Sequence, residues 1–278
     1  MGYFPEQFKN AITIMIPKKG KHKHNALNYR PIALLETLGK IYEKIINRRL
    51  KWFLEDSNKL NNLQFGFRPS RSTHTSITAM IEFITQSQKR GLSVFLLSKD
   101  IEKAFDKVHH PSLIHKMFTQ FDLPPLFCKS LANFLINRTI KIKVNGFCSD
   151  AFTPESGVPQ GSILGPLLYL MFINDAPKPD KVCFKNKYIY KSEFNSYFAD
   201  DNIIMTTGIE DGTRARTPSP KDVLFGNKRF RELVQQASNW EDAHRIKTNA
   251  SKSVIMMFSG KKTQSKKRKV LFNIASSQ

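Results

Sequence analysis

Cysteines and long apolar runs are scarce in this sequence, and each shortage excludes a class of protein. The 278 residues include 3 cysteines and 2 tryptophans. No two cysteines form a C-x-x-C pair, and their odd number argues against a disulfide framework or a zinc site and indicates a reducing, intracellular compartment. The longest nearly unbroken apolar stretch, Ile163 to Ile173, is too short to cross a bilayer. Residues 1–10 lack the apolar run and cleavage site of a signal peptide.

Acidic residues are also scarce relative to basic ones. Lys and Arg total 44 against 23 Asp and Glu, which gives a formal net charge of +21 and a pI near 9.9. Such a surplus attracts polyanions, and nucleic acid is the foremost candidate. On charge alone, a ribosomal-type or secreted basic protein, or one that binds acidic membranes, stays open. Hydrophobic residues make up 40% of the chain, which excludes wholesale disorder and predicts one domain or two closely packed subdomains.

Hydrophobic periodicity predicts a mixture of helices and strands. Helices are expected over 38–53, 75–89, 113–121, 124–135, 165–173 and 228–244, strands over 11–17, 92–97 and 253–258, and hairpins over 140–152 and 188–205. The polar or Lys-rich segments 178–195 and 207–227 are expected to be loops. Two helices show apolar stripes that we expect to face inward: Leu38, Ile41, Tyr42, Ile45, Leu50 and Phe53 (with Arg49) on the first, and Ile77, Met80, Ile81 and Ile84 on the second.

Three carboxylates are the main candidate for a chemical site. Asp100 follows a predicted buried strand, and Asp200 and Asp201 lie at the tip of a predicted hairpin. Adjacent like charges repel, so a partly buried Asp-Asp pair is costly unless a cation neutralises it. Two divalent ions about 3.5–4 Å apart can promote an in-line phosphoryl displacement. The alternative is a solvated turn, which is common for an Asp-Asp dipeptide.

The segments around these carboxylates resemble motifs of one enzyme family. Tyr197 to Asp201 (YFADD) resembles the F/Y-x-D-D box of reverse transcriptases, and Asp100 to Asp106 (DIEKAFD) resembles the other metal-binding box of that family. Ser156 to Pro166 (SGVPQGSILGP) is similar to its G-V-P-Q-G-S-x-L-G-P box.

The flanking segments narrow the resemblance. Asn28 to Leu35 (NYRPIALL) and Gln64 to Arg68 (QFGFR) resemble fingers motifs of the non-LTR branch, and Trp240 with Asn249 to Lys252 matches its W…N-x-x-K segment. Together the six boxes follow the order of the family from about residue 11 to 258. The sequence therefore resembles the reverse transcriptase domain of a non-LTR, LINE-like (jockey-like) retrotransposon, in truncated form.

The resemblance implies an α+β fold, the palm and fingers of a right-hand polymerase, with an antiparallel palm sheet packed on helices and the thumb mostly missing. Residues 1–95 would form the fingers with the start of the palm, 96–258 the palm, and 259–278 a basic tail that begins the truncated thumb. The run from Lys261 to Lys269 could bind nucleic acid, act as a nuclear address or be a solvated surface. The expected location is intracellular, nuclear or cytoplasmic, without a membrane.

The resemblance also implies RNA-directed DNA synthesis, with dNTPs added to the 3′-hydroxyl of a DNA primer on an RNA template. Two Mg²⁺ ions, with Mn²⁺ as an alternative, would be held by Asp100, Asp200 and Asp201, and Lys252 would donate a proton to pyrophosphate. Phe105 would exclude a ribose 2′-hydroxyl. The remaining implied contacts are Gln160, Gly161, Lys18, Lys19 and Arg30 to the nucleotide, and Arg68 and Arg71 to the template backbone. Surface charge is the alternative for each of these lysines.

One residue departs from the family pattern at the site. Lys99 stands before the first metal-binding aspartate, where the family has an apolar residue, and it could pair with phosphate or mark a decayed copy. An active polymerase core and a catalytically decayed, nucleic-acid-binding remnant therefore remain competing interpretations. A third, an RNA-dependent RNA polymerase or telomerase-like enzyme, fits the fingers and W…N-x-x-K segments poorly.

Overall fold

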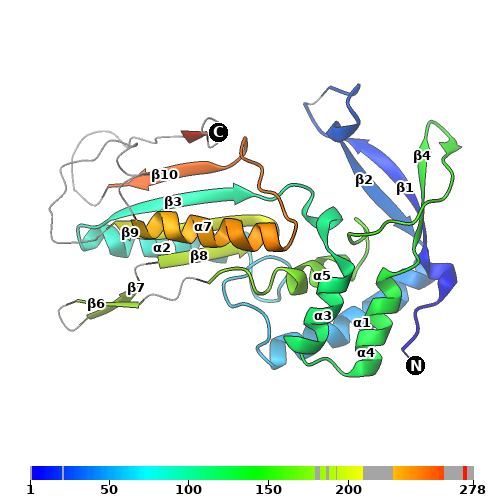
Figure 1. Cartoon of the computed structure of the whole chain (residues 1–278), viewed down its shortest axis with the longest axis horizontal. Coiled ribbons are helices and arrows are strands. Elements are labelled where there is room, and N and C mark those ends of the chain that lie inside the picture. Colours follow the sequence, from blue (N-terminus) through cyan, green and yellow to red (C-terminus); the bar gives the residue numbers. More distant parts are fainter. Residues whose placement is uncertain are drawn as a thin grey trace. The chain divides into compact units, whose positions relative to one another are not determined.

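The chain divides into two compact units in the computed structural model, and each unit is described separately (Figure 1). The first unit contains Met1–Asn61 and Lys103–Asn174, and the second contains Asn62–Glu102 and Asp175–Gln278. The structure describes residues 2–20, 22–178, 182–185, 188–191, 193–208, 228–259 and 272–273. Most of the basic tail, including Lys261 to Lys269, and most of the segment 207–227 lie outside these residues.

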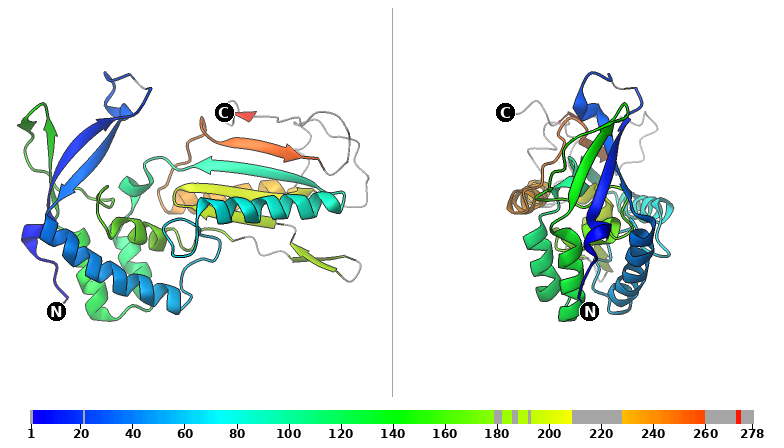
Figure 2. Two further views of the ribbon diagram at one scale, coloured as in Figure 1. Left: turned by 180° about the vertical axis from the view of Figure 1, so that it is seen from behind. Right: turned by 90° about the vertical axis from the view of Figure 1, so that its right-hand side faces the viewer.

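An antiparallel five-stranded sheet forms the second unit, in the order β11-β10-β3-β9-β8. Its strands are β3 (Ser93–Asp100), β8 (Glu193–Phe198), β9 (Asp201–Gly208), β10 (Val254–Phe258) and β11 (Phe272–Asn273). Two helices, α2 (Thr73–Lys89) and α7 (Lys228–Ala243), cover opposite faces of the sheet (Figures 1 and 2). The α+β class with an antiparallel palm sheet packed on helices is confirmed.

The apolar run of β3 is explained by burial on both faces. Phe95 and Leu97 pack with Phe230 and Leu233 of α7, whereas Val94 and its alternating neighbours pack toward α2. Because successive side chains of a strand point to opposite faces, a strand covered on both sides has no polar face. The central strand that ends at Asp100 is therefore rigidly embedded.

A mixed sheet and four α-helices form the first unit. The strand order is β2-β1-β4-β5, with β1 antiparallel to β2 and parallel to β4. The elements are η1 (Glu6–Lys9), β1 (Asn10–Pro17), η2 (Ala26–Asn28), β2 (Tyr29–Leu35), α1 (Thr37–Asp56), η3 (Ala104–Lys107), α3 (His110–Thr119), α4 (Pro125–Leu135), β4 (Thr139–Val144), β5 (Phe147–Cys148) and α5 (Gly165–Phe172). Asn145 and Gly146, both at positive φ (49° and 87°), form the expected β4–β5 turn.

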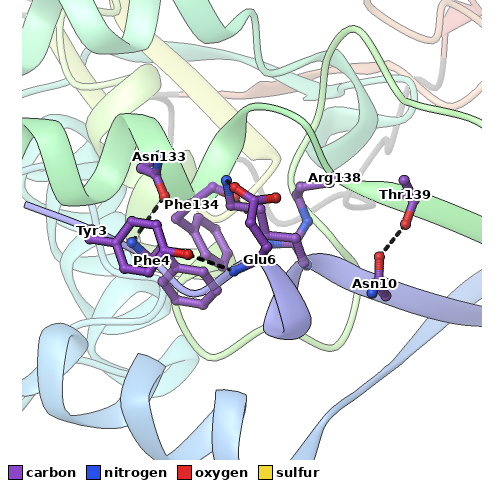
Figure 3. Close-up of polar contacts among 9 residues, drawn as sticks. Tyr3, Phe4, Glu6, Asn10, Asn133, Phe134, Arg138 and Thr139 are labelled. Atoms are coloured by element: carbon purple, nitrogen blue, oxygen red, sulfur yellow. Dashed lines mark hydrogen bonds and ion pairs between the residues drawn. The ribbon is translucent and has the colours of Figure 1, made fainter.

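The N-terminal segment is anchored to α4. Figure 3 shows the Phe4 ring next to Phe134, with ring centroids 5.1 Å apart, and the Phe4 amide donating to Asn133 Oδ1 at 2.9 Å. Phe4 is fully buried, so this contact is part of the core of the first unit and fixes the start of β1.

Three predictions about the elements were wrong, two of them in part. On α1, Leu50 of the predicted stripe is buried, but Leu38, Ile41 and Ile45 are largely exposed, and the helix buries Gly39, Glu43, Ile46 and Leu54 instead. On α2, Ile84 of the predicted stripe is buried together with Ser76, Phe83 and Ser87, whereas Ile77 and Ile81 are exposed. The expected loop at 178–195 contains a hairpin, β6 (Val182–Lys185) with β7 (Tyr188–Lys191), because two short β-prone runs there pair with each other.

Candidate active site

Two of the three candidate aspartates face each other across neighbouring strands. The register of β3 and β9 pairs Asp100 with Asp201, and Asp201 also pairs with Phe198 of β8. Side chains opposite each other in an antiparallel pair project from the same face of the sheet, about 4.5–5.5 Å apart at Cβ. Asp200 is next to this pair, in the two-residue turn between β8 and β9. The end of β3 and the tip of the β8–β9 hairpin therefore lie side by side, as the sequence predicts.

The turn that carries Asp200 is held in a strained conformation. Ala199, its first residue, has φ 57°, which is unfavourable for a residue other than glycine. The Gln64 side-chain oxygen accepts hydrogen bonds from the Ala199 amide at 3.3 Å and from the Gly66 amide at 2.7 Å. A Cβ on Gly66 would be 2.4 Å from the Ala199 nitrogen, so only glycine permits this approach. The QFGFR segment thus clamps the turn.

The same segment also bonds to β8 through its backbone. The Phe65 amide donates to the Tyr197 carbonyl at 2.7 Å, and the Tyr197 amide donates to Leu63 at 2.9 Å. Burial raises the pKa of the Tyr197 hydroxyl, which donates to the Pro177 carbonyl at 3.0 Å. The tyrosine of the YFADD box is therefore a structural support of the turn.

The surroundings of Asp200 and Asp201 destabilise the ionised forms of both carboxylates. Burial, and to a lesser extent repulsion from Asp100, raise the pKa of Asp200. Partial desolvation, followed by repulsion from Asp200 and Asp100, raises the pKa of Asp201. Raised carboxylate pKa values mean that the ionised forms are destabilised here, and a cation would relieve that cost.

Lys252 supplies one cationic group to this cluster. Its Nζ lies 2.8 Å from Asp100 Oδ2, and the side chain of Lys252 is 63% exposed. The backbone positions the pair, because the Asn249 amide donates to the Asp100 carbonyl at 2.7 Å. The W…N-x-x-K segment is thereby tied to the end of β3. The structure brings Lys252 to the carboxylates, and its role as a proton donor stays a prediction.

Lys99 does not lie among the carboxylates, so the hypothesis that it pairs with phosphate is wrong. It follows Phe95 and Leu97 on the α7 face of β3 and is 4% exposed. Its Nζ lies 2.5 Å from Glu241 Oε1 on α7, and Glu241 Oε2 accepts from the Thr248 hydroxyl at 2.6 Å. The lysine that stands where the family has an apolar residue is thus paired with a buried carboxylate.

The donor chemistry of the three aspartates fits a hard divalent cation. Among the residues that the structure describes, no three carboxylate, thiol or imidazole groups converge as a complete metal cage. Mg²⁺ does not require one, because it is usually held by one or two carboxylates together with substrate phosphates and water. Asp100 with Asp200 or Asp201 could supply such carboxylates.

Within the first unit, Phe105 of the DIEKAFD box and nearby Val108 are bonded to the SGVPQGSILGP box. The Val158 amide donates to the Phe105 carbonyl at 2.8 Å, and the Gly157 amide donates to the Val108 carbonyl at 2.8 Å. The Phe105 ring lies 5.0 Å from the buried ring of Tyr169 on α5, tilted by 31°. Phe105, the residue expected to exclude a ribose, is therefore held both at its backbone carbonyl and at its ring.

Gln160 and Gly161 lie within the SGVPQGSILGP box, in the loop that leads into α5. The Gln160 carbonyl accepts from the Ala33 amide of β2 at 2.7 Å, and Gln160 Nε2 donates to Asp106 Oδ1 at 3.1 Å. Gly161 has φ +121°, and a Cβ there would be 2.6 Å from the Ala33 carbonyl oxygen. The structure therefore brings Gln160 and Gly161 together with β2 and with the box that contains Phe105.

The three basic residues expected at the triphosphate lie in or near the β1–β2 hairpin. Arg30 is exposed and pairs with Ile16 across the strands. Lys18 Nζ donates to the Leu27 carbonyl at 2.9 Å, whereas Lys19 is exposed. Their contact with a nucleotide stays a prediction.

The two arginines expected at the template belong to the second unit. Arg68 is 8% exposed. Arg71 donates to the Asn62 carbonyl and lies over the Phe65 ring, 5.4 Å from its centroid. Arg71 thus supports the loop that clamps the aspartate turn, and contact of either arginine with a template stays a prediction.

Sequence reasoning missed three side chains that organise these sites: Gln64, Glu241 and Glu43. Glu43 of α1 is 1% exposed and accepts hydrogen bonds from the loop before α5. A glutamate within a helical stripe of buried positions was the available signal, because a carboxylate there needs donors. Gln64 gave no such signal, since its partner is a backbone amide distant in sequence.

An antiparallel sheet with aspartates at the end of a central strand and at an adjacent hairpin is typical of polymerase palms. The chain belongs to the reverse transcriptase family, because the family model described as "Reverse transcriptase (RNA-dependent DNA polymerase)" matches residues 16–272. The chain is 31% identical over 264 residues to the RNA-directed DNA polymerase from mobile element jockey of Drosophila melanogaster, covering 94% of this chain and 27% of that protein. It is 31% identical over 263 residues to the probable RNA-directed DNA polymerase from transposon X-element of the same species, covering 94% and 26%.

Solved structures support the same fold. Apo telomerase from Candida tropicalis, truncated from its C-terminal domain, superposes with a TM-score of 0.61 at 13% identity, covering 96% of this chain and 53% of that one. The chain spans about a quarter of the length of the jockey and X-element proteins. Within the described residues, no helix has the length and apolar character needed to cross a membrane.

Proposed function

We propose that this chain is an RNA-directed DNA polymerase core that adds dNTPs to a DNA primer on an RNA template. The single observation that carries the proposal is the cross-strand pairing of Asp100 with Asp201 beside the turn of Asp200. The similar jockey and X-element proteins are named as RNA-directed DNA polymerases, which supports this choice of substrate class.

The proposed reaction is a nucleotidyl transfer. The primer 3′-hydroxyl loses its proton to solvent and its oxygen bonds to the α-phosphorus of the dNTP, the bond from that phosphorus to the oxygen bridging to the β-phosphate breaks, and pyrophosphate leaves. Reverse transcriptases use divalent metals, and we propose two Mg²⁺ ions held by Asp100, Asp200 and Asp201, with Mn²⁺ as a substitute. When bound, these ions activate the attacking hydroxyl and stabilise the leaving oxygen.

The side chains of the chain supply the remaining steps. Asp100, Asp200 and Asp201 supply negative charge for the metals, and the clamp of Gln64 and Gly66 fixes the turn that carries Asp200 and leads into Asp201. Lys252 is the proposed proton donor to pyrophosphate, and Phe105 the proposed barrier to a 2′-hydroxyl. Lys18, Lys19, Arg30, Gln160 and Gly161 are the proposed nucleotide contacts, and Arg68 and Arg71 the proposed template contacts.

The alternative is a remnant that binds nucleic acid but has lost turnover. The net charge of +21 would serve such a protein equally well. The buried Lys99–Glu241 pair favours the active enzyme, because the unusual lysine has a matching carboxylate and leaves the aspartate face of β3 unchanged. We also propose an intracellular location, nuclear or cytoplasmic.

Primer extension distinguishes the two functions. The intact chain is mixed with a DNA primer on an RNA template, with dNTPs and either Mg²⁺ or Mn²⁺, and both binding and extension are measured. We expect extension with the wild-type chain and none with Asp200→Ala. Binding without extension under either metal would establish the remnant instead.

A further inference from the structure

Glu43 has an unusual environment for a carboxylate. It lies on α1 within the buried stripe of that helix and is the one charged residue of the stripe. Ionised side chains are rarely this deeply buried unless they are paired or hydrogen-bonded. Neither the proposed reaction nor the core packing of α1 explains a charge at this position.

One oxygen of Glu43 accepts three hydrogen bonds from the loop that leads into α5. The donors to Oε2 are the Ser162 hydroxyl at 2.6 Å, the Ile163 amide at 2.7 Å and the Leu164 amide at 3.1 Å. Ser162 Oγ in turn accepts from the Leu164 and Gly165 amides at 3.1 and 3.0 Å. The first amides of a helix lack intrahelical partners, and Leu164 has no side-chain oxygen with which to cap them. Glu43 and Ser162 therefore perform the capping together.

A buried cation lies in the electrostatic surroundings of Glu43. Arg138 is 2% exposed, and burial lowers the pKa of its guanidinium to about 10, while the charge of Glu43 opposes that shift. The Arg138 guanidinium donates to the Phe134 carbonyl at 3.1 Å. Glu43 thus has both the hydrogen-bond donors and the positive charge that a buried carboxylate requires.

The loop held by Glu43 carries Gln160 and Gly161. On its N-terminal side the loop is fixed by Ala33 and Asp106, through the bonds to Gln160. On its C-terminal side it is fixed by the Glu43 carboxylate at residues 162–164. Gly161 lies between the two anchors and has no side chain of its own to hold it. The placement of Gln160 and Gly161 therefore depends on both anchors.

We propose that Glu43 is a positioning residue for nucleotide binding, because its carboxylate fixes the Pro159–Leu164 loop that presents Gln160 and Gly161 to the incoming dNTP. The inference rests on the proposed function for the identity of the ligand. Glu43 acts through the loop and does not touch the nucleotide.

Four variants of the intact chain test this role. Glu43→Ala removes the acceptor, Glu43→Gln keeps an acceptor oxygen without the charge, and Ser162→Ala removes one donor at little change in volume. Glu36→Gln is the matched control, because Glu36 is an exposed carboxylate at the start of the same helix and makes no capping hydrogen bond. Binding of dNTP is measured by calorimetry on a complex with a dideoxy-terminated primer and RNA template, which requires no turnover.

For Glu43→Ala we expect the dNTP dissociation constant to rise by about tenfold or more, with primer–template affinity within about twofold of wild type. Glu43→Gln should restore most of the dNTP affinity, Ser162→Ala should weaken it by roughly threefold, and Glu36→Gln should not change it. Hydrogen exchange of residues 162–165 should accelerate in Glu43→Ala and much less in Glu43→Gln.

Wild-type dNTP affinity in folded Glu43→Ala, or equal losses of dNTP and primer–template affinity, would overturn the proposal. If Glu43→Ala does not fold, Ser162→Ala decides, and unchanged dNTP affinity in that variant would overturn it too. A wild-type chain that binds dNTP without extending the primer contradicts the proposed function and leaves this test intact.

Discussion

The ammonium group of Lys252 lies 2.8 Å from Asp100 Oδ2, at the end of the central strand of the palm sheet. The same positive charge lowers the pKa values of Asp200 and Asp201, against the larger effect of burial that raises both. Lys252 therefore favours the ionised state of the carboxylates that the proposed mechanism needs.

Replacing Lys252 should move the acidic limb of the activity profile to higher pH. In Lys252→Met, the opposing charge is lost, so the pKa values of Asp200 and Asp201 rise further and a higher pH is needed to ionise them. Metal binding requires the ionised carboxylates, so extension should fall off at a higher pH than in the wild type. The measurement is the pH dependence of single-nucleotide incorporation, with Lys247→Met as the exposed-lysine control. A limb that stays in place or moves to lower pH would refute this role.

Breaking the buried pair of Lys99 and Glu241 should destabilise the second unit. Glu241→Ala leaves a buried ammonium without its partner, which costs about 3–5 kcal/mol of unfolding free energy. The double variant Lys99→Met/Glu241→Gln removes both charges and retains an acceptor for Thr248, so it should recover most of that loss. Denaturant unfolding measures the free energy of unfolding of the single and the double variant. Equal stability of Glu241→Ala and wild type would show that the pair is not formed.

Gly66→Ala should slow nucleotide addition without unfolding the chain. Its Cβ would be 2.4 Å from the Ala199 nitrogen, so the turn that carries Asp200 must shift. Displacing a catalytic group by about 1 Å can cost roughly 10²-fold in rate. Gly91→Ala is the control for a glycine replacement without a steric clash, because nothing lies within 4 Å of the added Cβ, although Gly91, unlike Gly66, has a positive φ (+77°). Rate loss should be confined to Gly66→Ala, and a wild-type rate in that variant would show that the close contact does not position Asp200.

Phe105→Ala should relax the exclusion of ribonucleotides. The ring is fixed against Tyr169, so its removal opens space beside the proposed sugar position. Discrimination in a shape-selective pocket is typically about 10–200-fold, and we expect the ratio of kcat/KM for dNTP over rNTP to fall by about that factor. Phe118→Ala, an exposed phenylalanine of α3, is the control. Unchanged discrimination in Phe105→Ala would remove it from this role.

The sequence predicted where the three aspartates lie in the fold because that information is local. A buried strand that ends at Asp100 and a hairpin with Asp200 and Asp201 at its tip are each encoded by a short stretch. The structure then pairs Asp100 with Asp201. The order of the boxes predicted the family for the same reason.

The supporting contacts could not be predicted, because they join residues far apart in the chain. The stripe of Leu38, Ile41 and Ile45 indicated the wrong face of α1, since the helix instead buries Glu43 against a loop that follows much later. In the sequence Lys99 has the pattern of a defect, whereas in the structure it is paired with Glu241 of α7. Polar pairs of this kind leave no periodic signal in a single sequence.

The proposed function depends on Asp200 as a metal-binding carboxylate, and one comparison tests this role most directly. The rate of adding one dNTP to a DNA primer on an RNA template is measured at saturating Mg²⁺ for wild type, Asp200→Asn and the exposed control Asp242→Asn. Loss of a metal ligand removes several kcal/mol of transition-state stabilisation, so Asp200→Asn should be slower by about 10³-fold or more. Asp242→Asn should match the wild type. Comparable rates for Asp200→Asn and wild type would contradict the account.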